Sequence, residues 1–130
     1  MLRNISIRNL AVVEDVEVSF TNRMNVITGE TGSGKSLLID AIKLILGSRA
    51  DKSLIRAGEK ECSILAEFAF NEEFNINKLL AEMDLPICHD NSLIIKRTIS
   101  SSTSRNQVNN EPVTLQSLKK VGEIIVDMHG

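Results

Sequence analysis

The stretch Gly29-Glu30-Thr31-Gly32-Ser33-Gly34-Lys35-Ser36 decides how the rest of this sequence is interpreted. A triphosphate needs many hydrogen-bond donors close together, and glycines let the backbone curve tightly enough for successive N–H groups to point inward. The lysine that ends such a loop contacts the β and γ phosphates, and the hydroxyl of the next residue ligates Mg²⁺. The spacing therefore predicts an ATP–Mg²⁺ site over Gly29 to Ser36, with Lys35 on the phosphates and Ser36 on the metal.

The residues on either side favour a phosphate-binding loop (P-loop, or Walker A motif) over a glycine-rich turn that only precedes a buried helix. A short apolar run over residues 24–28 predicts a strand leading directly into the loop. From Lys35 onward, apolar residues recur at helical spacing as far as Leu46, and Gly47 stands where a helix would end. We therefore expect a helix that begins near Lys35 and adds its positive dipole end to the attraction for phosphate.

Alternating apolar and polar residues predict several strands elsewhere. Two runs, at 2–7 and 16–20, precede the loop and are expected to form an antiparallel pair. The later patterns predict an exposed loop at 48–60, strands at 63–70, 92–99, 107–108 and 112–113, a helix at 75–83 and a polar loop at 100–104. Asn109-Asn110 is expected to form a tight turn. We expect Thr114 to cap a short helix followed by Gly122, and residues 124–126 to form a buried strand.

The composition indicates one ordinary globular domain. The 130 residues are 42% hydrophobic and 25% charged, which argues against a disordered chain. The formal net charge of -2 provides no overall attraction to DNA, so a DNA contact would need a local basic patch or another part of a longer protein. Aromatic residues, at 3%, leave little material for stacking on single-stranded nucleic acid. Because the sequence starts without a long apolar run, we expect no membrane span and place the protein in the cytoplasm.

The two cysteines, Cys62 and Cys88, are interpreted as small apolar residues. Their separation does not match the ligand spacing of a zinc site. The pair Cys88-His89 could place a thiol beside an imidazole, as in a nucleophilic site, but no third, orienting group is evident. We therefore expect no catalytic cysteine.

The order of the elements resembles the heads of ATP-binding-cassette (ABC) and SMC proteins, because an antiparallel pair precedes the P-loop strand. Several stretches, which together span nearly the whole chain, sharpen this to a resemblance to the RecN branch of the SMC-like repair proteins. They are Ile5-x-Ile-Arg-Asn-Leu-Ala-Val-Val-Glu, Asn25-Val-Ile-Thr-Gly-Glu-Thr-Gly-Ser-Gly-Lys-Ser, Ile39-Asp-Ala-Ile, Leu46-Gly-Ser-Arg-Ala-Asp, Ile55-Arg-Ala-Gly and Val126-Asp-Met-His-Gly. Only the P-loop is specific by itself, so the resemblance depends on the order and spacing of all the stretches.

The resemblance implies an α/β P-loop NTPase fold, the N-terminal half of an ABC/SMC-type head. Its sheet would be mixed, with antiparallel strands plus the P-loop strand and helix. Residues 1–130 would be a partial ATP-binding head domain that lacks the remainder of the head and the coiled coil. In such heads Gly29 to Ser36 would bind ATP–Mg²⁺, and Arg56 would be the loop arginine implicated in ATP use and its coupling to DNA. Arg8 and Asn9 would lie on the adenine side. A solvated arginine and ordinary turn hydrogen bonds are the simpler explanations of these three residues.

The resemblance also implies an activity for the intact protein. SMC-like heads hydrolyse ATP when two heads enclose it, so the expected partners are ATP, a second head of the same protein and DNA. The family acts in recombinational repair of DNA double-strand breaks, which implies the bacterial cytoplasm and association with the nucleoid. The sequence has neither a Leu-Ser-Gly-Gly signature motif nor a clear Walker B motif. We therefore expect the intact protein to be an ATPase and the chain of 130 residues to hydrolyse little by itself.

Some alternatives stay open at the level of sequence. Asp127 is either a Walker B carboxylate or, as the resemblance favours, a strand residue before a missing glutamine loop. Lys96, Arg97 and Arg105 would contact DNA phosphates or protect a charged strand edge from aggregation. Two other functional classes are a self-contained P-loop phosphotransferase and a non-catalytic interaction module with a P-loop fold.

Overall fold

The computed structural model describes residues 1–20, 32–71 and 73–129, and it contains a six-stranded sheet in the order β2-β1-β3-β4-β5-β6. The strands are β1 (Leu2–Leu10), β2 (Val13–Ser19), β3 (Glu61–Ala69), β4 (Ser92–Ser100), β5 (Ser104–Val108) and β6 (Glu111–Val113). The helices are α1 (Gly32–Ile45), α2 (Ile76–Glu82) and α3 (Leu115–His129), with a short 3-10 helix at Lys52–Leu54. Every strand pairing within the described residues is antiparallel. The predicted P-loop strand at 24–28 lies outside these residues.

The pairing of β1 with β2 confirms the predicted antiparallel pair, with Ile5 opposite Val18 and Ile7 opposite Val16. The predicted strands at 63–70, 92–99, 107–108 and 112–113 and the helix at 75–83 are also present, as β3, β4, β5, β6 and α2. Asn109 and Asn110 have φ values of 50° and 69°, so the tight turn uses the left-handed backbone that asparagine tolerates.

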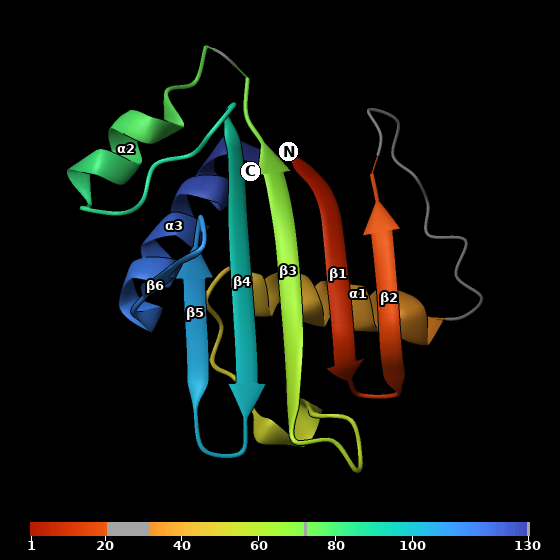
Figure 1. The fold of residues 1–130 in the computed structure, drawn as a ribbon. Helices are drawn as coiled ribbons and strands as arrows, with labels where there is room; N and C mark the ends of the chain where they lie inside the picture. Colours follow the sequence, from red (N-terminus) through yellow and green to blue (C-terminus); the bar gives the residue numbers. More distant parts are fainter. Residues whose placement is uncertain (21–31, 72, 130) are drawn as a thin grey trace.

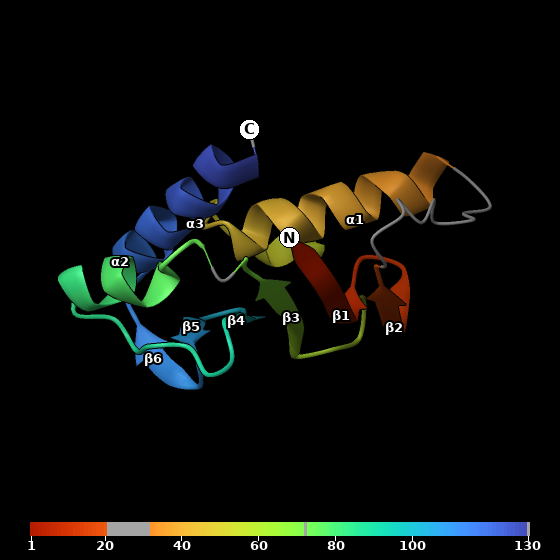
Figure 2. The ribbon, with the colours of Figure 1, turned by 90° about the horizontal axis from the view of Figure 1, so that it is seen from above.

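The core lies between the sheet and the helices, and it includes Ile76 and Leu80 of α2. In Figures 1 and 2, α1 and α3 cover the same face of the sheet, and α1 crosses the strands from β2 towards β4. The inward face of β4 shows the alternation that places residues in this core, since Leu93, Ile95 and Ile99 are buried while Lys96 is exposed. Among the described residues, no helix is long and apolar enough to cross a membrane.

The helix α3 corrects two predictions at the end of the chain. It runs continuously to His129, so residues 124–126 form no strand and Gly122 does not end the helix. The predicted cap is confirmed, because the Ser117 backbone N–H donates to Thr114 Oγ1 at 3.0 Å. The buried residues Leu118, Val121 and Ile125 follow helical spacing. Their contact with the core outweighs the strand preference of the short β-branched run that suggested a strand.

The predicted loop at 48–60 is confirmed, with one turn of 3-10 helix inside it. Asp51 caps this turn by accepting a hydrogen bond from Ser53 N at 2.9 Å. That backbone hydrogen bond, together with the Ser53 side chain, lowers the pKa of Asp51. A loop rich in charged residues therefore keeps a defined local structure before it reaches Arg56.

Candidate nucleotide-binding site

The predicted phosphate site lies at the beginning of α1. Gly29, Glu30 and Thr31 are outside the described residues, whereas Gly32 to Ser36 belong to the first turns of the helix. The helix thus begins a few residues before the predicted start near Lys35. Ser36 is exposed. Because the first backbone N–H groups of a helix have no partner within it and carry the positive end of the dipole, this position is chemically suited to a phosphate.

The loop of Arg56 and the end of β1 are joined through their backbones. Arg56 N donates to Asn9 O at 2.8 Å, and Ala11 N donates to Leu54 O at 2.7 Å. Asn9 and Ala11 both have left-handed φ values, 55° and 52°, which turn the chain so that these groups can meet. The structure therefore brings together two of the predicted site residues, Asn9 and Arg56, which are far apart in sequence.

Of the other described site residues, Ser36 lies apart from this junction, whereas Arg8 lies beside it, one residue before Asn9 on β1. Ser36 is on the first turns of α1, outside the junction between β1 and the Arg56 loop. The Arg8 side chain forms an ion pair with Asp15 on β2, with 3.8 Å between Nη2 and Oδ2, and both side chains are mostly exposed. Such exposed pairs contribute little to stability, so Asp15 does not hold Arg8 firmly.

Asp127 is not on a strand, contrary to both interpretations of the sequence. It lies near the end of α3 and is exposed. A Walker B carboxylate requires a strand that carries it to the metal, and the segment 124–127 is helical instead. Asp127 lines a hollow between α3 and the end of α1, together with Leu46, Gly47, Ser48 and Lys119.

Arg97 is the polar residue whose role was missed. Its side chain is 1% exposed, and Nη1 donates to Leu44 O at 2.8 Å and to Ser48 O. Its Nε donates to Ser104 Oγ at 3.4 Å, and burial lowers the pKa of the guanidinium. Both sequence interpretations of Arg97 are wrong, because it is inaccessible to DNA and β4 is an interior strand. Its position in the inward alternation with Ile95 and Ile99 was the available signal.

Lys96 and Arg105, grouped with Arg97 in the sequence, face away from the core. Lys96 is exposed, and Arg105 Nη2 lies 3.3 Å from Glu61 Oε2 in an exposed ion pair. Both residues line a hollow on the open side of the sheet that also contains Arg8, Asn9 and Lys60. A local basic surface therefore remains available there.

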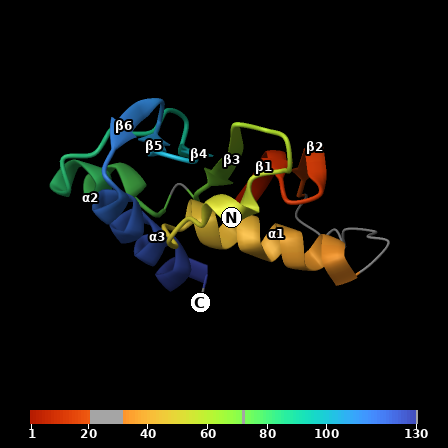
Figure 3. The ribbon, with the colours of Figure 1, turned by 90° about the horizontal axis from the view of Figure 1, so that it is seen from below.

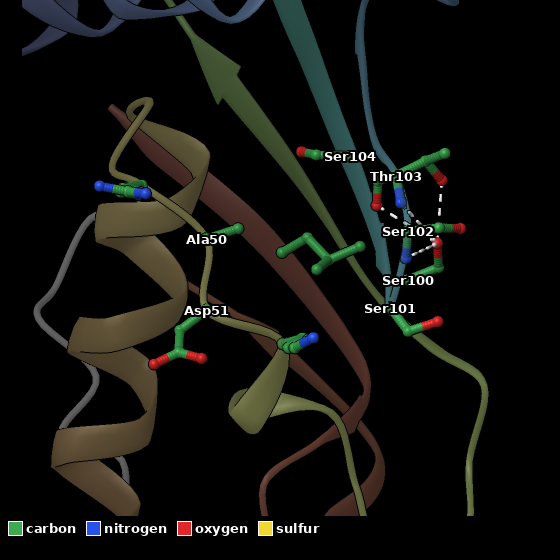
Figure 4. Close-up of a pocket in the computed structure, with 10 residues that line it drawn as sticks. Ala50, Asp51, Ser100, Ser101, Ser102, Thr103 and Ser104 are labelled. Atoms are coloured by element: carbon green, nitrogen blue, oxygen red, sulfur yellow. Dashed lines mark hydrogen bonds between the residues drawn. The ribbon is translucent and has the colours of Figure 1, made fainter.

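A second hollow separates the beginning of the Arg56 loop from the turn between β4 and β5. Figure 4 shows Ala50 and Asp51 on one wall and Ser100 to Ser104 on the other. The Ser100 hydroxyl accepts from the backbone N–H groups of Ser102 and Thr103, at 3.3 Å and 3.0 Å. Ser104 accepts from Arg97 at the inner side. The serine-rich turn thus uses part of its hydroxyl groups to hold its own backbone.

Comparison with known proteins identifies the family and the fold. The family described as AAA domain matches residues 4–127. The chain is 37% identical over its full length to DNA repair protein RecN of Bacillus subtilis and 35% identical to that of Vibrio cholerae. This identity over the full chain confirms the predicted resemblance to RecN proteins. The chain spans 23% of the length of each of these relatives.

Solved structures with the same fold include ATPase heads. A chain from a study of ATP-driven dimerization and DNA-stimulated activation of SMC ATPases superimposes with a TM-score of 0.69 at 20% identity, covering 92% of this chain and 75% of that one. The recombination mediator RecF with ATP superimposes with a TM-score of 0.64 at 17% identity, covering 87% of this chain and 27% of RecF. The predicted fold class, a P-loop NTPase head of the SMC type, is confirmed.

Proposed function

The chain belongs to the AAA domain family, and from that premise we propose that it binds ATP–Mg²⁺ through Gly29 to Ser36. The observation that carries the proposal is the glycine-rich stretch that ends on the first turns of α1. In this role Lys35 neutralises the β and γ phosphates, and the Ser36 hydroxyl ligates Mg²⁺. The exposed position of Ser36 supports its assignment, because a ligand must be able to approach it.

We assign supporting roles to the junction between β1 and the Arg56 loop. Arg56 would couple the nucleotide to events outside the head, and Arg8 and Asn9 would lie on the adenine side. The backbone hydrogen bond between Arg56 N and Asn9 O supports treating these residues as one unit, since movement of one is transmitted to the other. A displacement of the end of β1 caused by nucleotide binding would then also displace the Arg56 loop.

The intact protein, in our proposal, is a RecN-like ATPase that acts in recombinational repair of DNA double-strand breaks in the bacterial cytoplasm. The sequence similarity to RecN proteins and the fold shared with SMC ATPase heads support this proposed activity. Residues 1–130 would form the N-terminal part of the head. ATP would be enclosed between this head and the head of a second copy, and the ATP cycle would open and close their contact on DNA.

The first test is a calorimetric titration with ATP–Mg²⁺ of the wild-type protein, Lys35→Ala and Lys43→Ala. Lys43 is an exposed lysine in the last turn of the same helix, so it is a matched control for loss of one positive charge. We expect binding to be lost in Lys35→Ala and retained in Lys43→Ala. Equal binding in all three proteins would contradict the proposed site.

A second measurement separates the proposal from its alternatives. ADP release by residues 1–130 alone, measured with and without DNA, is expected to be negligible. Robust turnover by this chain, dependent on a small acceptor, would instead identify a self-contained phosphotransferase. If Lys35→Ala removed nucleotide binding and left every activity of the intact protein unchanged, the P-loop would belong to a non-catalytic interaction module.

A further inference from the structure

The guanidinium of Arg97 is a buried cation at a point where four segments meet. It lies on β4, contacts the end of α1 at Leu44 O, contacts the beginning of the Arg56 loop at Ser48 O, and contacts β5 at Ser104 Oγ. Among the described residues the ion pairs are Arg8–Asp15 and Arg105–Glu61, so Arg97 has no carboxylate partner there. A buried charge without such a partner is costly unless hydrogen bonds compensate it.

The end of α1 supplies that compensation. The last carbonyl groups of a helix have no partner within it and carry the negative end of the helix dipole. Leu44 O is one of these groups. It accepts from Gly47 N at 3.1 Å just beyond the helix, so that its second lone pair serves Arg97, and Ser48 O follows directly after the turn at Gly47. The cation of Arg97 and the end of α1 thus satisfy each other, which fixes where this end of the helix lies on the sheet.

Among the residues of α1 whose burial the structure describes, those at this end are also the most firmly packed. Ala41, Leu44 and Ile45 are buried, whereas Ser36 and Ile39 nearer the phosphate site are exposed. On the other side, α3 approaches so closely at Gly122 that an added Cβ would lie 2.2 Å from Leu46 O. Figure 3 shows α3 beside this end of α1. The helix is therefore anchored at the end opposite to the nucleotide.

Because α1 is held at one end, a small change of its direction there displaces its other end. About nine residues separate the anchor from the P-loop lysine, which is roughly 14 Å at 1.5 Å per residue. A tilt of about 5° at the anchor would therefore displace the first turn by about 1 Å, and a misplacement of about 1 Å can slow a reaction at a site by about a hundredfold. Small changes at the anchor should consequently reach the phosphate groups.

We propose that Arg97 is a positioning residue for nucleotide binding, which sets the direction of the P-loop helix and the start of the Arg56 loop through one guanidinium. The inference rests on the proposed ATP site. It goes beyond that site because Arg97 does not belong to any motif that contacts the nucleotide. It also links α1 to the loop that runs from Ser48 through the Asp51 cap to Arg56. The backbone N–H of Arg56 in turn donates to Asn9 O on β1.

The test compares nucleotide affinity and stability in the full-length protein. Arg97→Met removes the donors and keeps an unbranched apolar side chain, while Arg97→Lys keeps a positive charge on a side chain one atom shorter. Lys78→Met is the control, because it replaces an exposed cation by methionine on α2, outside the hollow that contains Arg8 and Asn9. Leu80→Ala, in the buried face of α2, supplies a protein destabilised in a helix that lies away from α1 at the other end of the sheet (Figures 1 and 2).

We expect Arg97→Met to raise the Kd for ATP–Mg²⁺ by about tenfold or more, because the phosphate-binding turn loses its orientation. Arg97→Lys should raise it by about threefold, since lysine lacks the planar group that serves three acceptors. Lys78→Met and Leu80→Ala should bind ATP–Mg²⁺ with the wild-type Kd while folded. Leu80→Ala should nevertheless show a lower melting temperature, which separates stability from positioning.

If Arg97→Met folds, two results would overturn the inference while leaving the ATP site intact. One is wild-type affinity in Arg97→Met when Lys35→Ala no longer binds. The other is a rise in Kd in Leu80→Ala equal to that in Arg97→Met, which would make the effect one of stability alone.

If Arg97→Met does not fold, Ser104→Ala decides, because it removes only the acceptor of Nε and should raise Kd by about twofold to threefold. Unchanged Kd in Ser104→Ala would then overturn the inference. Absence of ATP binding in the wild-type protein would refute the proposed function itself.

Discussion

Cys88 shows at the scale of single residues how a reactive group is kept inert. Asn77 holds its backbone on both sides, because Asn77 Oδ1 accepts from Cys88 N at 2.7 Å and Asn77 Nδ2 donates to Cys88 O at 3.2 Å. Asn109 Nδ2 lies 3.4 Å from the Cys88 sulfur. Burial raises the pKa of Cys88 despite this hydrogen bond, and it raises the pKa of Cys62 as well. Neither thiol has the lowered pKa of a nucleophile.

We therefore predict that both thiols resist Ellman's reagent at pH 8 in the folded protein. Modification should be about a hundredfold slower than in urea, the factor that corresponds to an opening free energy of roughly 3 kcal/mol. Burial raises the folded pKa of each thiol above its unfolded pKa. The stability that the protonated thiols contribute is therefore complete below the unfolded pKa and is lost as the pH rises through the folded pKa. Rapid modification of the folded protein at Cys88 would revive the hypothesis of a nucleophile beside His89.

At the scale of elements, the crossing of α1 and α3 depends on one glycine. Alanine at an ordinary position inside a helix is more stabilising than glycine by about 1 kcal/mol. At Gly122, however, the added Cβ would meet Leu46 O at 2.2 Å, and the neighbour is backbone that cannot move aside cheaply. The close contact should therefore outweigh the helix preference and reverse the sign of the substitution.

We predict that Gly122→Ala lowers the free energy of unfolding by about 1–3 kcal/mol, as overpacking of a close contact does. Urea denaturation followed by circular dichroism provides the measurement. Glu123→Ala is the control, because Glu123 is exposed one residue further along the same helix. A gain in stability for Gly122→Ala would show that the two helices can separate without cost.

The same elements show how far sequence reasoning reached. Period-two alternation predicted β1 to β4, and the glycine-rich stretch predicted that a helix follows it. The run Ile124-Ile125-Val126 was misread because its β-branched residues favour strands locally, whereas its helical state depends on contacts of Ile125 with the core. Arg97 was misread for a related reason. Its acceptors at Leu44 and Ser48 are distant in sequence, and only the folded chain brings them to β4.

At the scale of the whole molecule, charge is distributed unevenly although the net charge is -2. Arg8, Lys60, Lys96 and Arg105 line one hollow on the open side of the sheet, where Glu59 and Glu61 only partly offset them. The helices cover the opposite side. A net charge of this sign gives no long-range attraction to DNA, so any contact made by this head must depend on such a local surface.

We predict that Lys96 contributes one phosphate contact to DNA binding by the full-length protein. Lys96→Glu should weaken binding for all DNA sequences alike and reduce the slope of log Kd against log salt by about 1, because one fewer counterion is released. Affinity is to be measured by fluorescence anisotropy between about 50 and 200 mM salt. Lys78→Glu, an equal change of charge on an exposed residue of α2, serves as the control.

If both variants weaken binding equally, total charge governs the interaction and the open side of the sheet is not the DNA surface. A loss confined to Lys96→Glu would locate DNA on the side of the sheet opposite to α1, the helix that carries the proposed ATP site.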